Sequence, residues 1–126
     1  MFRAALVTLA LALSSPSAVA TEILQLTKGP NARWSVGDKS QLAVTSDGRL
    51  GVVLTVQKSP NAGQAYYVVS FETKTGLPVN FSARVSDRPM QRTHFAARAE
   101  PARPYQWGEH LPAEIGTVYV MVRPSK

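Results

Sequence analysis

Five arginines lie four to six positions apart between residues 84 and 103, and their chemistry suggests an anion-binding surface. A guanidinium group binds a carboxylate or a phosphate through two parallel hydrogen bonds. Prolines among the arginines would stiffen this segment and lower the entropy lost on binding, and two aromatic residues of a type common at recognition surfaces follow them. The alternative is a solvated connector whose arginine stems cover apolar surface. The candidate partner-binding residues are Arg84, Arg88, Arg92, Arg98, Arg103, Tyr105 and Trp107.

A second possible chemistry is copper binding by a thioether and imidazoles. Met90 and His94 are four positions apart, and His110 follows further along the chain. In a regular strand, residues four apart share a face but are separated by about 13 Å, so these ligands can meet only if the chain bends between them. The alternative is that the three side chains have core or surface roles.

Catalytic constellations are scarce in this sequence. The chain has two histidines, no cysteine and eight scattered Asp and Glu residues. No serine lies in a nucleophile-elbow motif, and no EF-hand loop or HExxH pair occurs. Asp38 and Asp47, which adjoin glycines, suit turn positions. The sequence therefore predicts a protein that binds without catalysis and needs no cofactor.

The candidate residues must be positioned by short β-strands. Apolar and polar residues alternate with a period of two over short runs, which turn residues separate, and this pattern is typical of an all-β domain. It predicts six or seven strands in a small antiparallel β-sandwich of immunoglobulin-like architecture; a small barrel is the alternative. The expected strands cover residues 22–27, 40–45, 50–57, 65–73, 79–85 and 116–123, with a weaker one at 93–97.

The alternation also predicts the buried faces. In the 40–45 strand, Leu42 and Val44 should point inward, and the Asp47-Gly48 pair should turn the chain into the next strand. The 116–123 strand is apolar on both faces, including Met121, so we expect it in the middle of a sheet.

Outside the strands, the two tryptophans receive opposite interpretations. Trp34 should plug one end of the core, whereas Trp107, which polar and turn residues surround, should be exposed. Prolines interrupt residues 98–105, which we interpret as an extended connector.

The N-terminus has the pattern of a secretory signal peptide. Arg3 precedes an apolar run at residues 4–13 and a small-x-small sequence that ends at Ala20. This run is too short to cross a bilayer, which takes about 20 residues. We expect a signal peptide at 1–20 with cleavage after Ala20, and one domain at 21–126 that has no membrane span and is periplasmic or secreted.

The chain carries 14 Lys and Arg against 8 Asp and Glu, a balance that favours an acidic protein or an anionic envelope component as partner. Exported proteins rarely meet nucleic acid, so we expect none. The main hypothesis is a non-catalytic binding protein that recognises an acidic partner through a basic edge formed by residues 84–107. The alternatives are a periplasmic copper carrier that uses Met90, His94 and His110, and a structural component of an envelope assembly. The oligomeric state stays open.

Overall fold

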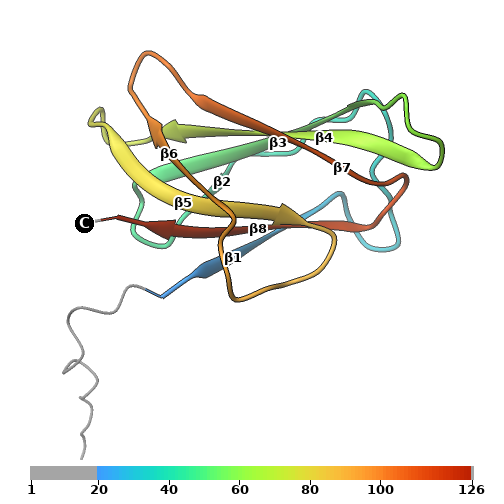
Figure 1. Ribbon diagram of the computed structural model, residues 1–126, viewed down its shortest axis with the longest axis horizontal. Helices are drawn as coiled ribbons and strands as arrows, with labels where there is room; N and C mark the ends of the chain where they lie inside the picture. The colour runs from blue at the N-terminus through green and yellow to red at the C-terminus, as the bar shows by residue number, and fades with distance from the viewer. Residues whose placement is uncertain (1–19, 126) are drawn as a thin grey trace, which may run out of the picture.

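The computed structural model describes residues 20–125, which form eight β-strands and no helix. Two four-stranded antiparallel sheets face each other across one core (Figure 1), an arrangement compatible with a β-sandwich. The all-β prediction is therefore confirmed. The strands are β1 (Glu22–Thr27), β2 (Ala43–Val44), β3 (Leu50–Lys58), β4 (Gln64–Thr73), β5 (Val79–Ser86), β6 (Phe95–Ala99), β7 (Tyr105–Pro112) and β8 (Thr117–Pro124).

Sheet A has the strand order β1-β8-β5-β6. Met121 of β8 lies opposite Ile23 of β1 on one side and Arg84 of β5 on the other. The valines of β8 point into the core, while Met121 is fully buried on the other face. The prediction that this strand lies inside a sheet is confirmed.

Sheet B has the order β2-β3-β4-β7. The turn before β3 forms where the sequence predicts it, because Gly48 adopts a φ of 75° that side chains disfavour. Its backbone N–H donates to the Thr45 carbonyl over 2.8 Å, and the Thr45 N–H donates to the Leu50 carbonyl over 2.9 Å. These bonds close the chain reversal and start β3 at Leu50.

One hydrophobic core fills the space between the sheets. Phe71 of β4 meets Phe81 of β5 there, with ring centroids 4.8 Å apart, and Tyr67 of β4 is buried in the same core. Trp34 is 2% exposed and closes the margin of this core, as the sequence predicts. Its indole Nε1 donates a 2.9 Å hydrogen bond to the Leu26 carbonyl, so the one polar atom of the ring is satisfied.

The expected strand at residues 40–45 contracts to the two residues of β2. Lys39 pairs with Thr55, but Ala43 pairs with Val52, so one extra residue is inserted on this side of the ladder. The Ser40 hydroxyl accepts from the Leu54 N–H over 2.8 Å, a bond that a backbone carbonyl would normally accept. This irregularity is a β-bulge, a common feature of edge strands.

The bulge overturns the prediction that Leu42 and Val44 point inward. An inserted residue reverses the alternation of faces along a strand. Ala43 therefore packs against the core, and Leu42 and Val44 are 43% and 42% exposed.

Strand β7 is a second departure, because no strand is predicted from the sequence at residues 105–112; the connector predicted at residues 98–105 shortens to residues 100–104 between β6 and β7. It pairs with β4 from Gln64↔Pro112 to Phe71↔Tyr105. Its sequence YQWGEHLP contains no β-branched residue and includes Gly, Glu and Pro, which are depleted in strands, so its composition gives a weak strand signal. Its prolines do not disrupt the ladder, because Pro104 precedes the strand and Pro112 ends it. The weak strand expected at 93–97 is β6, shifted to Phe95–Ala99.

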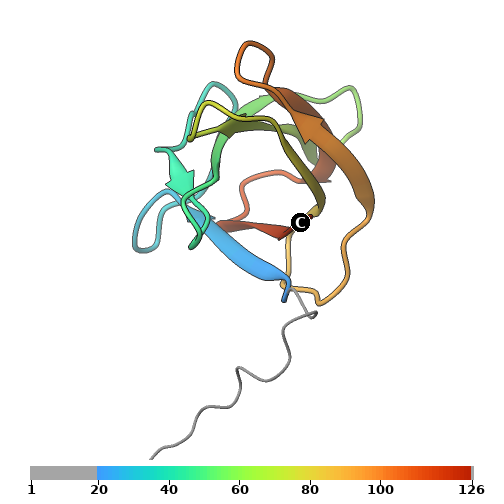
Figure 2. The ribbon, with the colours of Figure 1, turned by 90° about the vertical axis from the view of Figure 1, so that its left-hand side faces the viewer.

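The two sheets approach each other along two seams. On one side the chain passes from β6 to β7 through a tight connection with a Glu100↔Arg103 bridge. On the other side β1 of sheet A faces β2 and the segment that leads into it. Viewed from the end, both sheets curve around the common core (Figure 2).

The expected signal peptide falls almost wholly on residues 1–19, which lie outside the described part of the chain. Within residues 20–125, no helix is long and apolar enough to span a membrane.

Candidate binding surfaces

Sheet A presents a basic outer surface, which we call the arginine face and define as Arg84, Arg88, Arg92, Arg98 and Arg123. Strand β5 organises it, because its residues Val79, Phe81, Ala83 and Val85 are buried and the alternating residues point outward. Arg98 lies beside Asn80, Arg123 beside Ser82, and Arg84 is itself outward. These three rows follow each other at about 7 Å, the two-residue repeat of a strand.

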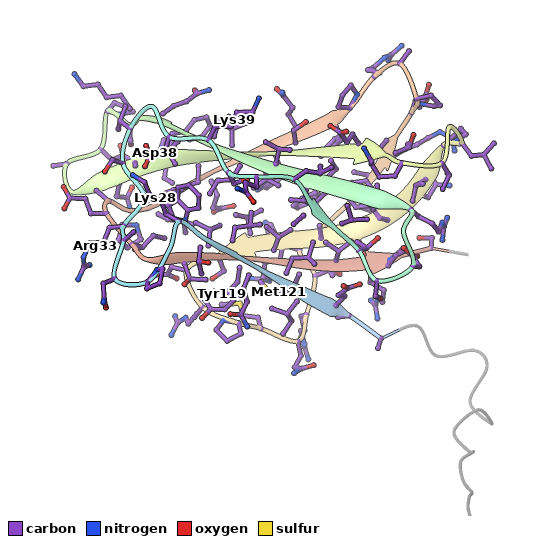
Figure 3. The ribbon with its side chains drawn as sticks, turned by 180° about the vertical axis from the view of Figure 1, so that it is seen from behind. Lys28, Arg33, Asp38, Lys39, Tyr119 and Met121 are labelled. Atoms are coloured by element: carbon purple, nitrogen blue, oxygen red, sulfur yellow. The ribbon has the colours of Figure 1, made fainter. Side chains whose placement is uncertain are left out.

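The β5–β6 loop (residues 87–94) crosses the outer side of sheet A, below β8 in Figure 1. Thr93 Oγ1 donates to Ser82 Oγ over 3.1 Å, and Arg84 Nη1 donates to the Met90 sulfur over 3.5 Å, so the loop is attached to β5. This covering explains why Met121, on the outer face of β8 (Figure 3), is 0% exposed.

Arg84 differs from the other arginines of the face in having a buried guanidinium nitrogen without a partner within residues 20–125. Its Nε is buried and has no hydrogen-bond partner among the described residues. The sulfur that Nη1 contacts is a weak acceptor, and no carboxylate of residues 20–125 lies within 4.0 Å of the guanidinium. A positive charge is thus held in place on the sheet without a counter-ion.

The other predicted arginines divide between two places. Arg88 and Arg92 are exposed on the β5–β6 loop. Arg98 contacts Glu100 over 3.4 Å and Asn80 over 3.3 Å, and such an exposed pair contributes little. Arg103 lies on the β6–β7 connection, away from the loop, so the five arginines of the predicted site do not form one surface. The fifth arginine of the arginine face is Arg123 of β8, not Arg103.

Tyr105 and Trp107 are half-buried in an aromatic row between the sheets, which corrects the expectation that Trp107 is exposed. Trp107 stacks on Phe95 with centroids 4.0 Å apart, and Tyr105 stacks on the same ring at 5.9 Å. Trp107 Nε1 also donates to Glu109 Oε1 over 2.9 Å. These two residues join β7 to β6 and do not extend the arginine face.

The three candidate copper ligands lie in separate surroundings. Met90 contacts a guanidinium, which would repel a cation. His94 packs edge-on against Trp107 at 5.8 Å. His110 lies on the opposite face of β7, against Tyr66 and within 2.9 Å of Ser59 Oγ. Residues 20–125 contain no cluster of three His, Cys, Asp or Glu side chains suited to a metal ion.

Two carboxyl groups have pKa values below the ordinary range because they accept hydrogen bonds in turns. The bond from Lys28 Nζ, 2.7 Å long, is the main cause of the lowered pKa of Asp38. For Asp47, partial burial raises the pKa, but hydrogen bonds from Thr45 Oγ1 and the Arg49 N–H outweigh it. Both groups are therefore charged at neutral pH and stabilise local structure.

A surface that sequence reasoning missed lies at the seam between β1 and residues 38–43. It encloses a cavity of about 540 Å³ with Leu26 and Trp34 among its lining residues and Lys28, Asp38 and Lys39 at one side. Figure 3 shows the Lys28 and Asp38 side chains next to each other, whereas Lys39, which pairs with Thr55, projects on the outer side of sheet B. In the sequence, only the apolar residue Leu42 indicates this surface, and the alternation pattern predicts that Leu42 lies in the core.

Comparisons with known proteins add no relative: no family model, no curated protein and no solved structure matches this chain.

Proposed function

We propose that this chain is an exported, non-catalytic binding domain of immunoglobulin-like architecture, which recognises an acidic partner through the arginine face. The partner class is an acidic protein or an anionic component of the cell envelope. Export rests on the signal-peptide pattern at residues 1–20, and the architecture rests on the two facing antiparallel sheets.

The observation that carries the proposal is the uncompensated charge of Arg84. A buried polar group without a partner costs about 1–3 kcal/mol, and this cost is present in the free protein at Arg84 Nε. An anion on the arginine face would supply the counter-charge that residues 20–125 lack. The attraction would act on the charge of the whole guanidinium, since Nε itself is buried.

The placement of the arginines supports the same conclusion. Arg84, Arg98 and Arg123 project from paired strands, so their backbones need no ordering when a partner binds. Arg88 and Arg92 come from a loop that is attached to β5 through Thr93 and Met90. Two carboxylates, Asp87 and Glu100, belong to the same surroundings, so the surface remains positive.

The test compares two triple variants of equal net charge. The face variant carries Arg84→Met, Arg98→Gln and Arg123→Gln, and the control carries Lys58→Gln, Lys74→Gln and Arg103→Gln. Binding of a poly-glutamate peptide and of purified lipopolysaccharide is measured by calorimetry at low and physiological salt. We expect the face variant to bind at least one probe about tenfold more weakly, a loss of about 1.4 kcal/mol, while the control changes little.

The two probes separate the partner classes, since a preference for the peptide indicates a protein and a preference for lipopolysaccharide indicates the envelope. Equal weakening in both triple variants would show that only net charge matters. Unchanged binding by a folded face variant would equally refute the proposal.

A further inference from the structure

The described residues contain two methionines, and their surroundings are opposite. Met90 lies half-buried on the β5–β6 loop, whereas Met121 of β8 is 0% exposed on the outer face of the sheet that this loop crosses. An oxidant converts a thioether to a sulfoxide only when it can reach the sulfur, so susceptibility follows exposure. Met90 is therefore the methionine of residues 20–125 that a peroxide in the surrounding medium reaches first.

The Met90 sulfur also faces a charged donor. Arg84 Nη1 donates to it over 3.5 Å, but a thioether sulfur is a weak acceptor. The Nε of Arg84 is buried and lacks a hydrogen-bond partner within residues 20–125, and no carboxylate of these residues lies within 4.0 Å of the guanidinium. A strong acceptor is thus missing at the point where the loop meets Arg84.

Oxidation of Met90 would supply such an acceptor. The sulfur lone pair attacks the terminal oxygen of a hydroperoxide, the O–O bond breaks, and the proton of the transferred hydroxyl passes to the leaving oxygen, which departs as water or an alcohol. The sulfur loses two electrons and the peroxide gains them. The sulfoxide oxygen is polar and accepts hydrogen bonds, and a bond from a charged guanidinium is stronger than one from a neutral donor.

Other contacts of the loop keep Met90 beside Arg84 during this change. Thr93 Oγ1 donates to Ser82 Oγ over 3.1 Å, so the loop is attached to β5 independently of the sulfur. A sulfoxide bonded to Arg84 would preserve the second attachment. An oxygen added to Met121, which is fully buried, would instead overpack the contact between the loop and the sheet.

We propose that Met90 is a reversible oxidation site for peroxides, whose sulfoxide oxygen accepts a hydrogen bond from Arg84 and keeps the β5–β6 loop attached to sheet A. The attached loop continues to shield Met121 from the oxidant. Methionine sulfoxide reductases then return the Met90 sulfur to its reduced state. This site does not depend on the arginine face as an anion-binding surface, because its measurements involve no anionic ligand.

The first measurement follows the full chain in hydrogen peroxide by peptide mass spectrometry. We expect Met90 to gain one oxygen at least about tenfold faster than Met121, in keeping with its exposure. Met121 should keep its slow rate after Met90 is fully oxidised. Treatment of the folded product with the two reductases, which act on opposite sulfoxide epimers, should restore the original mass at Met90.

Three results of this measurement overturn the proposal. They are oxidation of both methionines at one rate, a Met121 rate that rises once Met90 has reacted, and a Met90 sulfoxide that the reductases leave unreduced. The second result would mean that the sulfoxide detaches the loop from sheet A.

The second measurement locates the hydrogen bond by urea unfolding of the wild type and of Arg84→Leu, each with Met90 reduced and oxidised. We expect oxidation to favour unfolding at least about fivefold more in Arg84→Leu than in the wild type, since only the wild type offers the sulfoxide a charged donor. Arg103→Leu, on the β6–β7 connection, is the matched control and should respond like the wild type. An equal effect of oxidation with and without Arg84 refutes the bond.

Met90→Gln mimics the sulfoxide without an oxidant. Its carbonyl oxygen is bonded to the atom that takes the place of the sulfur, so it can accept from Arg84, whereas Met90→Leu removes the acceptor. Met90→Gln should gain stability relative to Met90→Leu only when Arg84 is present, and the same difference in Arg84→Leu would contradict the proposal. If Arg84→Leu does not fold, the peroxide rates of Met90 and Met121 in the wild type still decide.

Discussion

Phe95 and Trp107 stack face to face, with ring centroids 4.0 Å apart and ring planes inclined by 11°. Phe95 belongs to β6 in sheet A and Trp107 to β7 in sheet B, so this pair joins the two sheets beside their shared connection. Tyr105, two residues before Trp107 in β7, also stacks on Phe95, and the His94 ring packs edge-on against Trp107. Aromatic contact here takes the place of the hydrogen-bond ladder that a closed barrel would have.

This stack should be measurable as a coupling between the two residues. Phe95→Ala and Trp107→Ala should each lower the free energy of unfolding by about 2–4 kcal/mol, since both rings are partly buried. A double-mutant cycle in urea should give a coupling of about 0.5–1.5 kcal/mol. Trp107→Ala combined with Tyr119→Ala, on the outer face of β8, should be additive. A coupling of zero between Phe95 and Trp107 would contradict a role for the stack.

Stability should fall at acidic pH because two aspartates have lowered pKa values in the folded protein. Hydrogen bonds lower the pKa of Asp38 and, despite partial burial, that of Asp47. A carboxyl with a lowered folded pKa stabilises the protein above its unfolded pKa of about 3.9. This stabilisation is lost as the pH falls through the folded pKa.

The check is the urea midpoint measured from neutral pH down through the acidic range in which the two carboxylates become protonated. The Asp38→Asn and Asp47→Asn double variant should show a flatter decline. Lys28→Met, which removes the main hydrogen bond to Asp38, should reproduce the effect of Asp38→Asn. An unchanged slope in the double variant would mean that other carboxyl groups cause the acid sensitivity.

Arg84 should show opposite effects on stability and on binding. Arg84→Met removes a buried donor without a partner and retains a stem that packs near Met121, so the free energy of unfolding should be unchanged or about 1 kcal/mol higher. Arg84→Ala, which also removes the stem, should destabilise the protein. Urea unfolding separates the two variants. Equal destabilisation by both would show that the guanidinium is needed for folding.

Strong alternation made most of the fold predictable. In β4, β5 and β8 the residues that face the core are mostly large and apolar. A shift of the strand pairing by one residue would turn them outward and bury polar residues instead, so only one register is compatible with the sequence. The same alternation assigns Arg123 to the outer side of β8 with Met121, although this residue was not included in the predicted site.

Other features depend on contacts that no local pattern contains. The bulge before β2 arises from the Ser40 hydroxyl bonding to β3, which reverses the faces of Leu42 and Val44. Strand β7 is defined by its pairing with β4, and Gly108 is needed there because the Tyr66 ring lies where a side chain would be. The seam could not be predicted from the sequence, because it forms only where β1 and β2, which belong to different sheets, face each other.

The pairing of β1 with β8 has a kinetic consequence. Glu22 pairs with Val122 and Thr27 with Thr117, so the first strand finds its neighbour only when the last strand is available. Strand β8 also separates β1 from β5, so β1 can join sheet A only after β8 has formed. Such long-range pairing slows folding to milliseconds or longer. The attachment of β1 to sheet A is therefore expected to be a late step of folding, since it joins residues about 90 positions apart in the sequence.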